Sequence, residues 1–232
     1  RKMMFLRGDF DTVGVPMAYM WDLLVNRTTA LEGIEMYYDI PTLTSDSIHF
    51  QWDIDSVSPY IFTGTLPTGI PTTFFNNEHC RKAFAYALNF SRLIAEAWWY
   101  EGEQPATWHI DNLVPDFRDP TINAYDINLT KIEEELKAAT MNATGGSTGV
   151  VKSVWAWGFK MGLLYNEGND QRRIACEMIE SAIESLNPKR ALEGYTNPID
   201  ISVEFLPWGD YLDAMEFHEI PAFQIGWLAD FA

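Results

Sequence analysis

Residues 76–89 read NNEHCRKAFAYALN, and this stretch decides the fold because it opens the strongest helical pattern in the chain. From residue 78 to about residue 100, apolar side chains recur at spacings of three and four and form one stripe: Cys80, Ala83, Ala87, Phe90, Ile94 and Trp98. Asn76 or Asn77 can cap the first turn, because an asparagine oxygen accepts a hydrogen bond from a free backbone N–H. We therefore predict a helix over residues 78–100 whose small residues let it pack closely on a sheet.

Outward from this helix, predicted strands and helices interleave along the chain. Half-buried or apolar strands are expected over 33–39, 47–54, 199–205 and 222–228, with one or two more within 150–165. Further helices are expected over 129–139 and from 169 or 170 to 186, and residues 1–30 should hold two short helical stretches. This interleaving predicts an α/β lobe of mixed topology.

The composition excludes nucleic-acid and membrane-spanning proteins. The chain has 232 residues, 47% of them hydrophobic, which is enough to bury the core of one domain or one large lobe. Its net charge of −17 opposes nucleic-acid binding, because phosphates require a cationic surface. No run of 18 apolar residues occurs, so no membrane span is predicted. The nine Trp and ten Tyr can pack in the core or line a cleft, and composition leaves both interpretations open.

The two cysteines, Cys80 and Cys176, do not predict a metal site. They lack the CxxC spacing and the paired histidines of zinc sites. They can form one disulfide or serve as two small buried hydrophobic residues, and we favour the second interpretation.

Sequence signatures of catalysis are incomplete. Residues 145–149 read GGSTG and match the GxSxG nucleophile elbow, but that motif lies between a strand and a helix, whereas here a predicted helix precedes it. His218-Glu219 lacks the second histidine of a zinc protease motif, and Asp53-Ile54-Asp55 lacks the glycine and glutamate of a calcium loop. We predict a surface loop at 145–149, and no enzymatic activity, metal or cofactor.

Several blocks of the chain, in one order, resemble the oligopeptide/dipeptide/nickel class of extracellular solute-binding proteins, family 5, of ABC transporters. The helical stretch at 76–89 is similar to that family's D-x-R-V-R-x-A-L-x-Y-A-I-D segment. The other blocks are LRGDFD at 6–11, Pro105-Ala106, Tyr125-Asp126 followed by LKAA at 136–139, LLYN at 163–166, WGDYL at 208–212 and GWLADF at 226–231. Each block is degenerate, but their common order covers nearly the whole chain.

This resemblance implies a mixed-sheet lobe of the type II periplasmic-binding-protein-like fold. Residues 1–39 would end the other lobe and form the hinge crossover, and residues 40–232 would form the C-terminal ligand-binding lobe. The chain would then be a fragment of a longer receptor.

The resemblance also implies a function in transport without catalysis or a cofactor. The receptor would be monomeric, would lie on the extracellular side of the cell membrane, and would capture peptides between two lobes for an ABC permease. An oligosaccharide receptor of the same family is an alternative, and so is a non-transport sensor domain on the same fold.

Three residues are implied in ligand binding. Asp230 matches the carboxylate that pairs with the α-ammonium of a bound peptide, although it could instead cap a loop. Trp227 and Trp208 match aromatic residues that line the pocket, although either could belong to the core. Met215 and Gln224 occupy positions where some peptide receptors carry arginines for the ligand's carboxylate. The absence of arginine at both positions weakens the peptide assignment and makes a sugar the alternative ligand, because tryptophan can stack on a sugar.

Overall fold

The computed structural model describes residues 2–15, 22–25, 29–37, 44–98 and 125–228, and its centre is a four-stranded sheet. The strand order is β3-β8-β6-β7, formed by β3 (Thr44–Phe50), β8 (Ala222–Leu228), β6 (Phe159–Asn166) and β7 (Ile199–Leu206). The last three strands run parallel to one another, and β3 is antiparallel to β8. The sheet is therefore mixed, as predicted.

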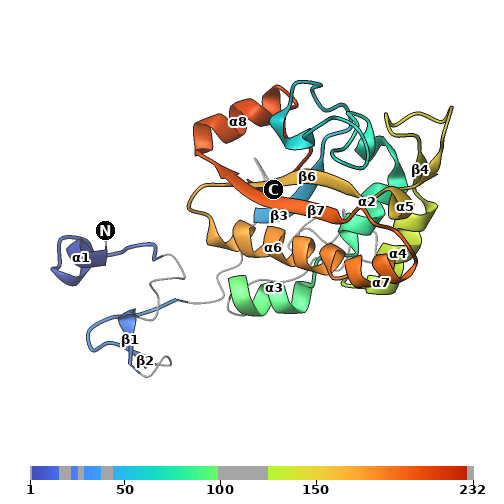
Figure 1. The fold of residues 1–232 in the computed structure, drawn as a ribbon. Coiled ribbons are helices and arrows are strands. Elements are labelled where there is room, and N and C mark those ends of the chain that lie inside the picture. The colour runs from blue at the N-terminus through green and yellow to red at the C-terminus, as the bar shows by residue number, and fades with distance from the viewer. Residues whose placement is uncertain (1, 16–21, 26–28, 38–43, 99–124, 229–232) are drawn as a thin grey trace, which may run out of the picture.

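Helices cover both faces of this sheet (Figure 1). On one side lie α2 (Glu78–Ala85), α3 (Phe90–Ala97), α4 (Leu129–Ala138), α6 (Asp170–Glu184) and α7 (Asn187–Leu192), and their buried residues form the larger core. The other face packs on α8 (Trp208–Glu216) and on Tyr60 of the 3-10 turn η2 (Pro59–Ile61), around a smaller core. Alternation along β8 divides the faces: Ala222 enters the larger core and Phe223 the smaller one.

The remaining elements are short. They are α1 (Lys2–Leu6), β1 (Leu24–Val25), β2 (Thr29–Ala30), the 3-10 turn η3 (Phe74–Asn76), β4 (Thr140–Met141), β5 (Lys152–Ser153) and α5 (Val154–Trp157). The strands β1 and β2 form an antiparallel pair, and so do β4 and β5. The loop at 145–149 joins β4 to β5 rather than a strand to a helix, which confirms it as a surface loop.

The predicted continuous helix over 78–100 is wrong, because the chain forms two helices with a break at 86–89. Asn77 caps α2 by accepting a hydrogen bond from the His79 N–H at 3.0 Å. Asn89 does the same for α3, accepting from the Arg92 N–H at 2.9 Å. An asparagine that bonds to a nearby backbone N–H competes with the helical ladder, so Asn89 starts a new helix rather than continuing the first. Residues 99–100 lie outside the described part.

Other boundaries are confirmed or shifted. The strand at 222–228 is confirmed, and the helices predicted from 129 and from 170 are confirmed with ends one to two residues earlier. The strand predicted at 47–54 starts and ends earlier as β3, because the Ile54 N–H leaves the sheet and donates to the Thr72 carbonyl. Residues 33–37 form no strand, and 1–30 hold one α-helix among their described positions. The interpretation of 150–165 is confirmed by β5 and β6, with α5 between them.

Both thiols are buried and unbonded, which confirms our interpretation of the cysteines. Burial raises the pKa of Cys176 to about 12 and raises that of Cys80 as well. Since the thiolate is the reactive species, we expect neither cysteine to react with Ellman's reagent in the folded protein at pH 8. Both should react at once in denaturant. A thiol titrated under native conditions would contradict this prediction.

Candidate functional site

The carboxyl ends of three parallel strands meet at one edge of the sheet. β6 ends at Asn166, β7 at Leu206 and β8 at Leu228, and the antiparallel β3 begins beside them at Thr44. Two helices also start at this edge, α6 after β6 and α8 after β7, at the left of the sheet in Figure 1. Ligands of open α/β sheets bind beyond the carboxyl ends of the strands, so this edge is the natural candidate site.

Two of the three predicted site residues lie at this edge with exposed side chains. Trp227, near the end of β8, is 66% exposed, and Trp208, the first residue of α8, is 50% exposed. Alternation from Phe223 places Trp227 on the face of the sheet that α8 covers, which is the side of Trp208. The Trp208 ring stacks on that of Tyr211, with centroids 6.1 Å apart. Neither tryptophan is a core residue, so both offer surface to a ligand.

The third predicted residue, Asp230, lies outside the described residues, and its role stays a prediction. The structure does describe Met215 and Gln224, the two positions where some peptide receptors carry arginine. Gln224 is buried on the opposite face of β8, and its side-chain oxygen has no hydrogen-bond partner within the described structure. Met215 packs against the smaller core. Neither side chain brings a positive charge to the edge.

Sequence reasoning missed an ion pair at the same edge. Arg172, in the first turn of α6, donates from Nε to Asp46 Oδ1 of β3 at 3.0 Å and from Nη1 to Asn166 Oδ1 at 2.7 Å. Both charged side chains are largely buried. Gly226 of β8 lies against the pair: a Cβ there would be 2.8 Å from Asp46 Oδ1 and 3.0 Å from Arg172 Nη2. The pair therefore joins β3, β6, β8 and α6 at the residue before Trp227, on the face of the sheet opposite to the Trp227 side chain.

No local pattern could have revealed this ion pair, because its two partners are 126 residues apart in sequence. Asn166 and Gly226 do fall within two blocks of the family resemblance, LLYN and GWLADF. The resemblance identifies these two positions but does not predict which residues they contact.

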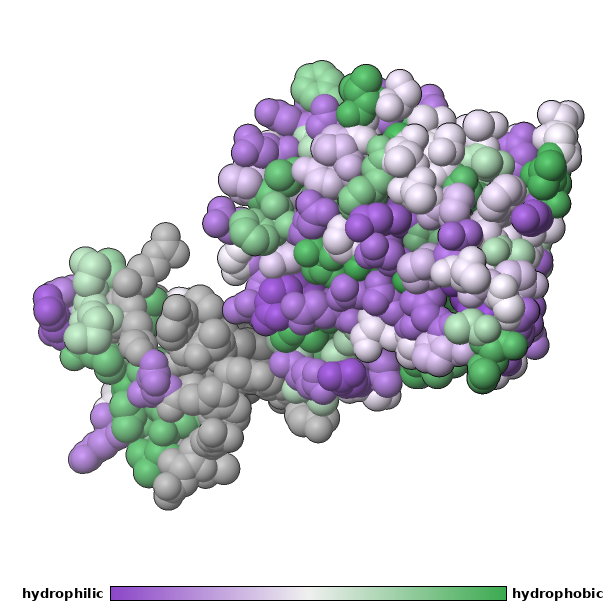
Figure 2. Space-filling view, in the orientation of Figure 1, coloured by the Kyte–Doolittle hydropathy of each residue, from purple (hydrophilic) through white to green (hydrophobic). Residues whose placement is uncertain are grey.

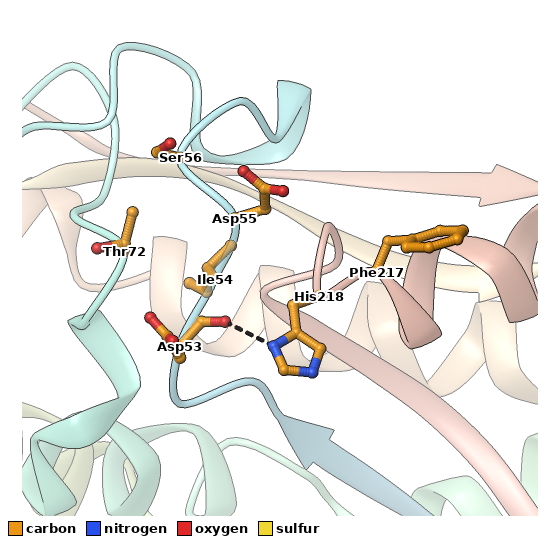
Figure 3. A pocket seen from close by; sticks show the side chains of 7 residues that line it. All are labelled: Asp53, Ile54, Asp55, Ser56, Thr72, Phe217 and His218. Atoms are coloured by element: carbon orange, nitrogen blue, oxygen red, sulfur yellow. Dashed lines mark hydrogen bonds between the residues drawn. The ribbon is translucent and has the colours of Figure 1, made fainter.

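A polar pocket of about 340 Å³ lies at the opposite end of the sheet, where β3 ends and β8 begins. Its lining is Asp53, Ile54, Asp55, Ser56, Thr72, Phe217 and His218 (Figure 3). The two incomplete motifs of the sequence, at residues 53–55 and 218–219, meet at this pocket. His218 Nδ1 lies 3.2 Å from the Asp53 carbonyl oxygen, and the Asp55 N–H donates to the His218 carbonyl at 2.9 Å. No group of three or more His, Cys, Asp or Glu side chains suited to a metal occurs among the residues with described positions.

Membrane-spanning helices are also absent from the part of the chain that the structure describes, since none there is both long and apolar enough.

The carboxyl edge of the sheet combines two exposed aromatic rings, two helix N-termini and a fixed ion pair. Such an edge can bind a ligand by stacking and polar contacts.

Comparison with solved structures shows the same fold. The peptide STSA complex of the periplasmic binding protein DppA from Helicobacter pylori has a TM-score of 0.64 and 17% identity, over all of this chain and 35% of that one. A mannohexaose-bound periplasmic oligopeptide-binding protein from Thermotoga maritima has a TM-score of 0.59 and 11% identity, over 97% of this chain and 37% of that one. NikZ from Campylobacter jejuni with Ni(L-His) has a TM-score of 0.58 and 13% identity, over all of this chain and 38% of that one.

These neighbours confirm the type II periplasmic-binding-protein-like lobe, and this chain spans between one third and two fifths of their lengths. A search of curated proteins found no match. The family model described as "Bacterial extracellular solute-binding proteins, family 5 Middle" matches residues 1–232. Because that match covers the whole sequence, the chain belongs to the bacterial extracellular solute-binding proteins of family 5.

Proposed function

We propose that this chain forms part of the substrate-binding component of an ABC importer, which captures peptides between two lobes and delivers them to a membrane permease. Residues 40–232 would be the C-terminal ligand-binding lobe, and residues 1–39 the end of the other lobe with the hinge crossover. The observation that carries the proposal is the pair of exposed tryptophans, Trp208 and Trp227, at the carboxyl edge of the sheet.

The binding chemistry follows from this edge. Closure of a second lobe over the tryptophans would exclude water and bring their rings against the ligand. Asp230, two residues beyond the end of β8, would pair with the α-ammonium of a peptide, since a cleft charge that loses its water must meet an opposite charge. Binding of this kind needs no covalent step, so we propose no enzymatic activity. The receptor would work as a monomer outside the cell membrane.

An oligosaccharide is the second candidate ligand. Neither Met215 nor Gln224 supplies a cation for a peptide's carboxylate, and the faces of Trp208 and Trp227 can stack on sugar rings. The Thermotoga maritima neighbour is a mannohexaose-bound protein of similar fold, which supports a sugar as the second candidate.

Calorimetry on the full-length receptor separates the two ligand classes. We expect short peptides with a free N-terminus to bind, and Asp230→Ala to weaken them at least about tenfold, which is the effect of losing about 1.4 kcal/mol. The same peptides with an acetylated N-terminus should lose no affinity on Asp230→Ala, because they carry no ammonium for the carboxylate to pair with.

Asp200→Ala is the matched control, since Asp200 lies at the amino end of β7 and away from the candidate edge. If mannose or β-linked oligosaccharides bind and peptides do not, the sugar alternative replaces the peptide. If free and acetylated peptides bind alike, Asp230 does not pair with an ammonium.

A further inference from the structure

Charge is divided unevenly between two sides of the molecule. Residues 44–77 and 199–228 contain no Lys or Arg, although they hold three acidic residues in the first segment and six in the second. All 16 Lys and Arg lie elsewhere in the sequence. The two segments supply β3, β7, β8, α8 and the loop that carries η2. Asp46 pairs with Arg172 of α6 on the other face, and the remaining carboxylates make the side of the sheet that α8 covers acidic.

The opposite helical layer balances its charges by ion pairs along its helices. Glu78 pairs with Lys82 on α2, Glu96 with Arg92 on α3 and Glu134 with Lys131 on α4. On the α8 side, no salt bridge reaches Asp53, Asp213 or Glu216 from any residue of known position.

One lysine reaches the α8 side from β6, but its positive charge is already paired with a carboxylate. Lys160 pairs with Asp200 at 2.8 Å and lies over the Phe62 ring at 4.7 Å. Burial and nearby carboxylates raise the pKa of Tyr60 beneath α8, as expected beside excess negative charge.

Apolar side chains are exposed among these carboxylates. Phe217, which follows α8, is 63% exposed, and Leu212 of α8 and Val57 of the η2 loop are exposed as well. The polar pocket joins the two segments, because Asp53 and Asp55 line it from one side and Phe217 and His218 from the other (Figure 3). We call this surface the α8 face: Leu212, Asp213, Glu216 and Phe217, with Asp53, Asp55 and Val57 across the pocket.

The α8 face is held in shape by backbone contacts. His218 has a φ of +60°, a left-handed conformation that turns the chain directly after Phe217, the C-cap residue of α8. Its carbonyl accepts from the Asp55 N–H, and its Nδ1 faces the Asp53 carbonyl oxygen. The space-filling view shows hydrophilic and hydrophobic residues mixed over the part of the body where α8 lies (Figure 2).

We propose that the α8 face docks a protein surface that carries Lys or Arg side chains around an apolar socket, and that this surface belongs to the importer's membrane subunits. The inference rests on the proposed function, which supplies such a partner. Opposite charges attract the partner and fix its orientation, and an exposed aromatic side chain anchors it. A cationic side chain fits the pocket between Asp53 and Asp55, and Phe217 fills the apolar socket.

Other partners fit this surface less well. Nucleic acid and anionic lipid are repelled by exposed carboxylates without neighbouring cations. The cleft ligand would bind at the carboxyl ends of the strands, whereas the pocket lies at the other end of the sheet. A basic protein surface satisfies both the charge and the apolar anchors.

Binding of the full-length receptor to the ABC importer encoded with it, reconstituted in nanodiscs, tests this inference. The variant Asp53→Asn/Asp213→Asn/Glu216→Gln removes three charges from the α8 face. The control Glu78→Gln/Glu96→Gln/Glu134→Gln removes three from the opposite layer, at side chains that are also exposed. At 50 mM salt we expect the first variant to dock at least about tenfold more weakly and the control within about twofold of wild type. Phe217→Ala should weaken docking at any salt concentration.

Equal losses in the two triple variants would show a general charge effect and overturn the inference, as would wild-type docking by the α8-face variant. Maleimide labelling of Phe217→Cys in the full-length receptor adds a second arm. Rapid labelling supports an open face, and slow labelling would show that the receptor's own chain covers it, which overturns the inference. A receptor that docks but binds neither peptide nor sugar would contradict the proposed ligands and leave the docking inference standing.

Discussion

Replacing Arg190 by alanine is expected to lower the free energy of unfolding by about 3–4 kcal/mol. Arg190 of α7 is only 1% exposed, yet it bears a full charge. Its Nε donates to the Trp155 carbonyl at 2.9 Å, and its Nη1 donates to Asn187 Oδ1 at 3.1 Å and to the Asn197 carbonyl at 2.7 Å. The alanine variant would leave these acceptors unpaired and open a cavity between α5, α7 and the start of β7.

An opposing effect must be weighed against this loss. Burial lowers the pKa of Arg190, and its Nη2 has no hydrogen-bond partner in the described structure, so keeping the charge there costs free energy. Three hydrogen bonds from a charged donor, each worth about 1.5–3 kcal/mol, exceed that cost. The guanidinium also lies over the Trp155 ring, 5.7 Å from its centroid.

Urea denaturation of Arg190→Ala beside Lys189→Ala measures the effect. Lys189 is the neighbouring residue, but its side chain is exposed and its partner Glu133 keeps a second ion pair with Lys137, so its loss should cost less than about 1 kcal/mol. If both variants unfold at the same urea concentration, the bonds of Arg190 contribute nothing net to stability.

The sequence predicted the elements whose signals are local. Alternation predicted β7 to within one residue of its end, and the apolar spacing with Asn169 or Asp170 as a cap predicted α6. The break at 86–89 escaped prediction because the apolar stripe of α2 continues onto α3. Both helices pack on the same core, so the apolar spacing continues across the break and gives no sign that a second helix begins.

The candidate site was predictable in part. The family resemblance identified Trp208 and Trp227, and the structure places both at the carboxyl edge. Their exposure could not be predicted, because a tryptophan in a strand or in a first helical turn is also compatible with the core. The Asp46–Arg172 pair and the pocket between Asp53 and His218 are contacts between distant segments, which only tertiary structure brings together.

Gly226→Ala should both destabilise the protein and weaken ligand binding. The new methyl group would collide with Asp46 Oδ1 and Arg172 Nη2, and neither side chain can move without breaking a largely buried ion pair. Overpacking of this kind costs about 1–3 kcal/mol, and loss of the pair adds to it, so we expect a loss of about 3 kcal/mol. Because Gly226 precedes Trp227 on β8, a shift of the strand would also misplace the tryptophan. Chemical denaturation and calorimetry on the full-length receptor measure the two effects.

Gly209→Ala is the matched control for this prediction. Gly209 lies in α8 with open space where a Cβ would stand, so alanine there should be neutral or stabilise the helix by up to about 1 kcal/mol. Two glycines of neighbouring elements thus have opposite expected outcomes for one physical reason, the space beside the Cα atom. A Gly226→Ala receptor as stable as wild type would show that the edge can relax around a methyl group. The Asp46–Arg172 pair would then not fix the end of β8, and the position of Trp227 would have to be set by the ligand or by the opposing lobe.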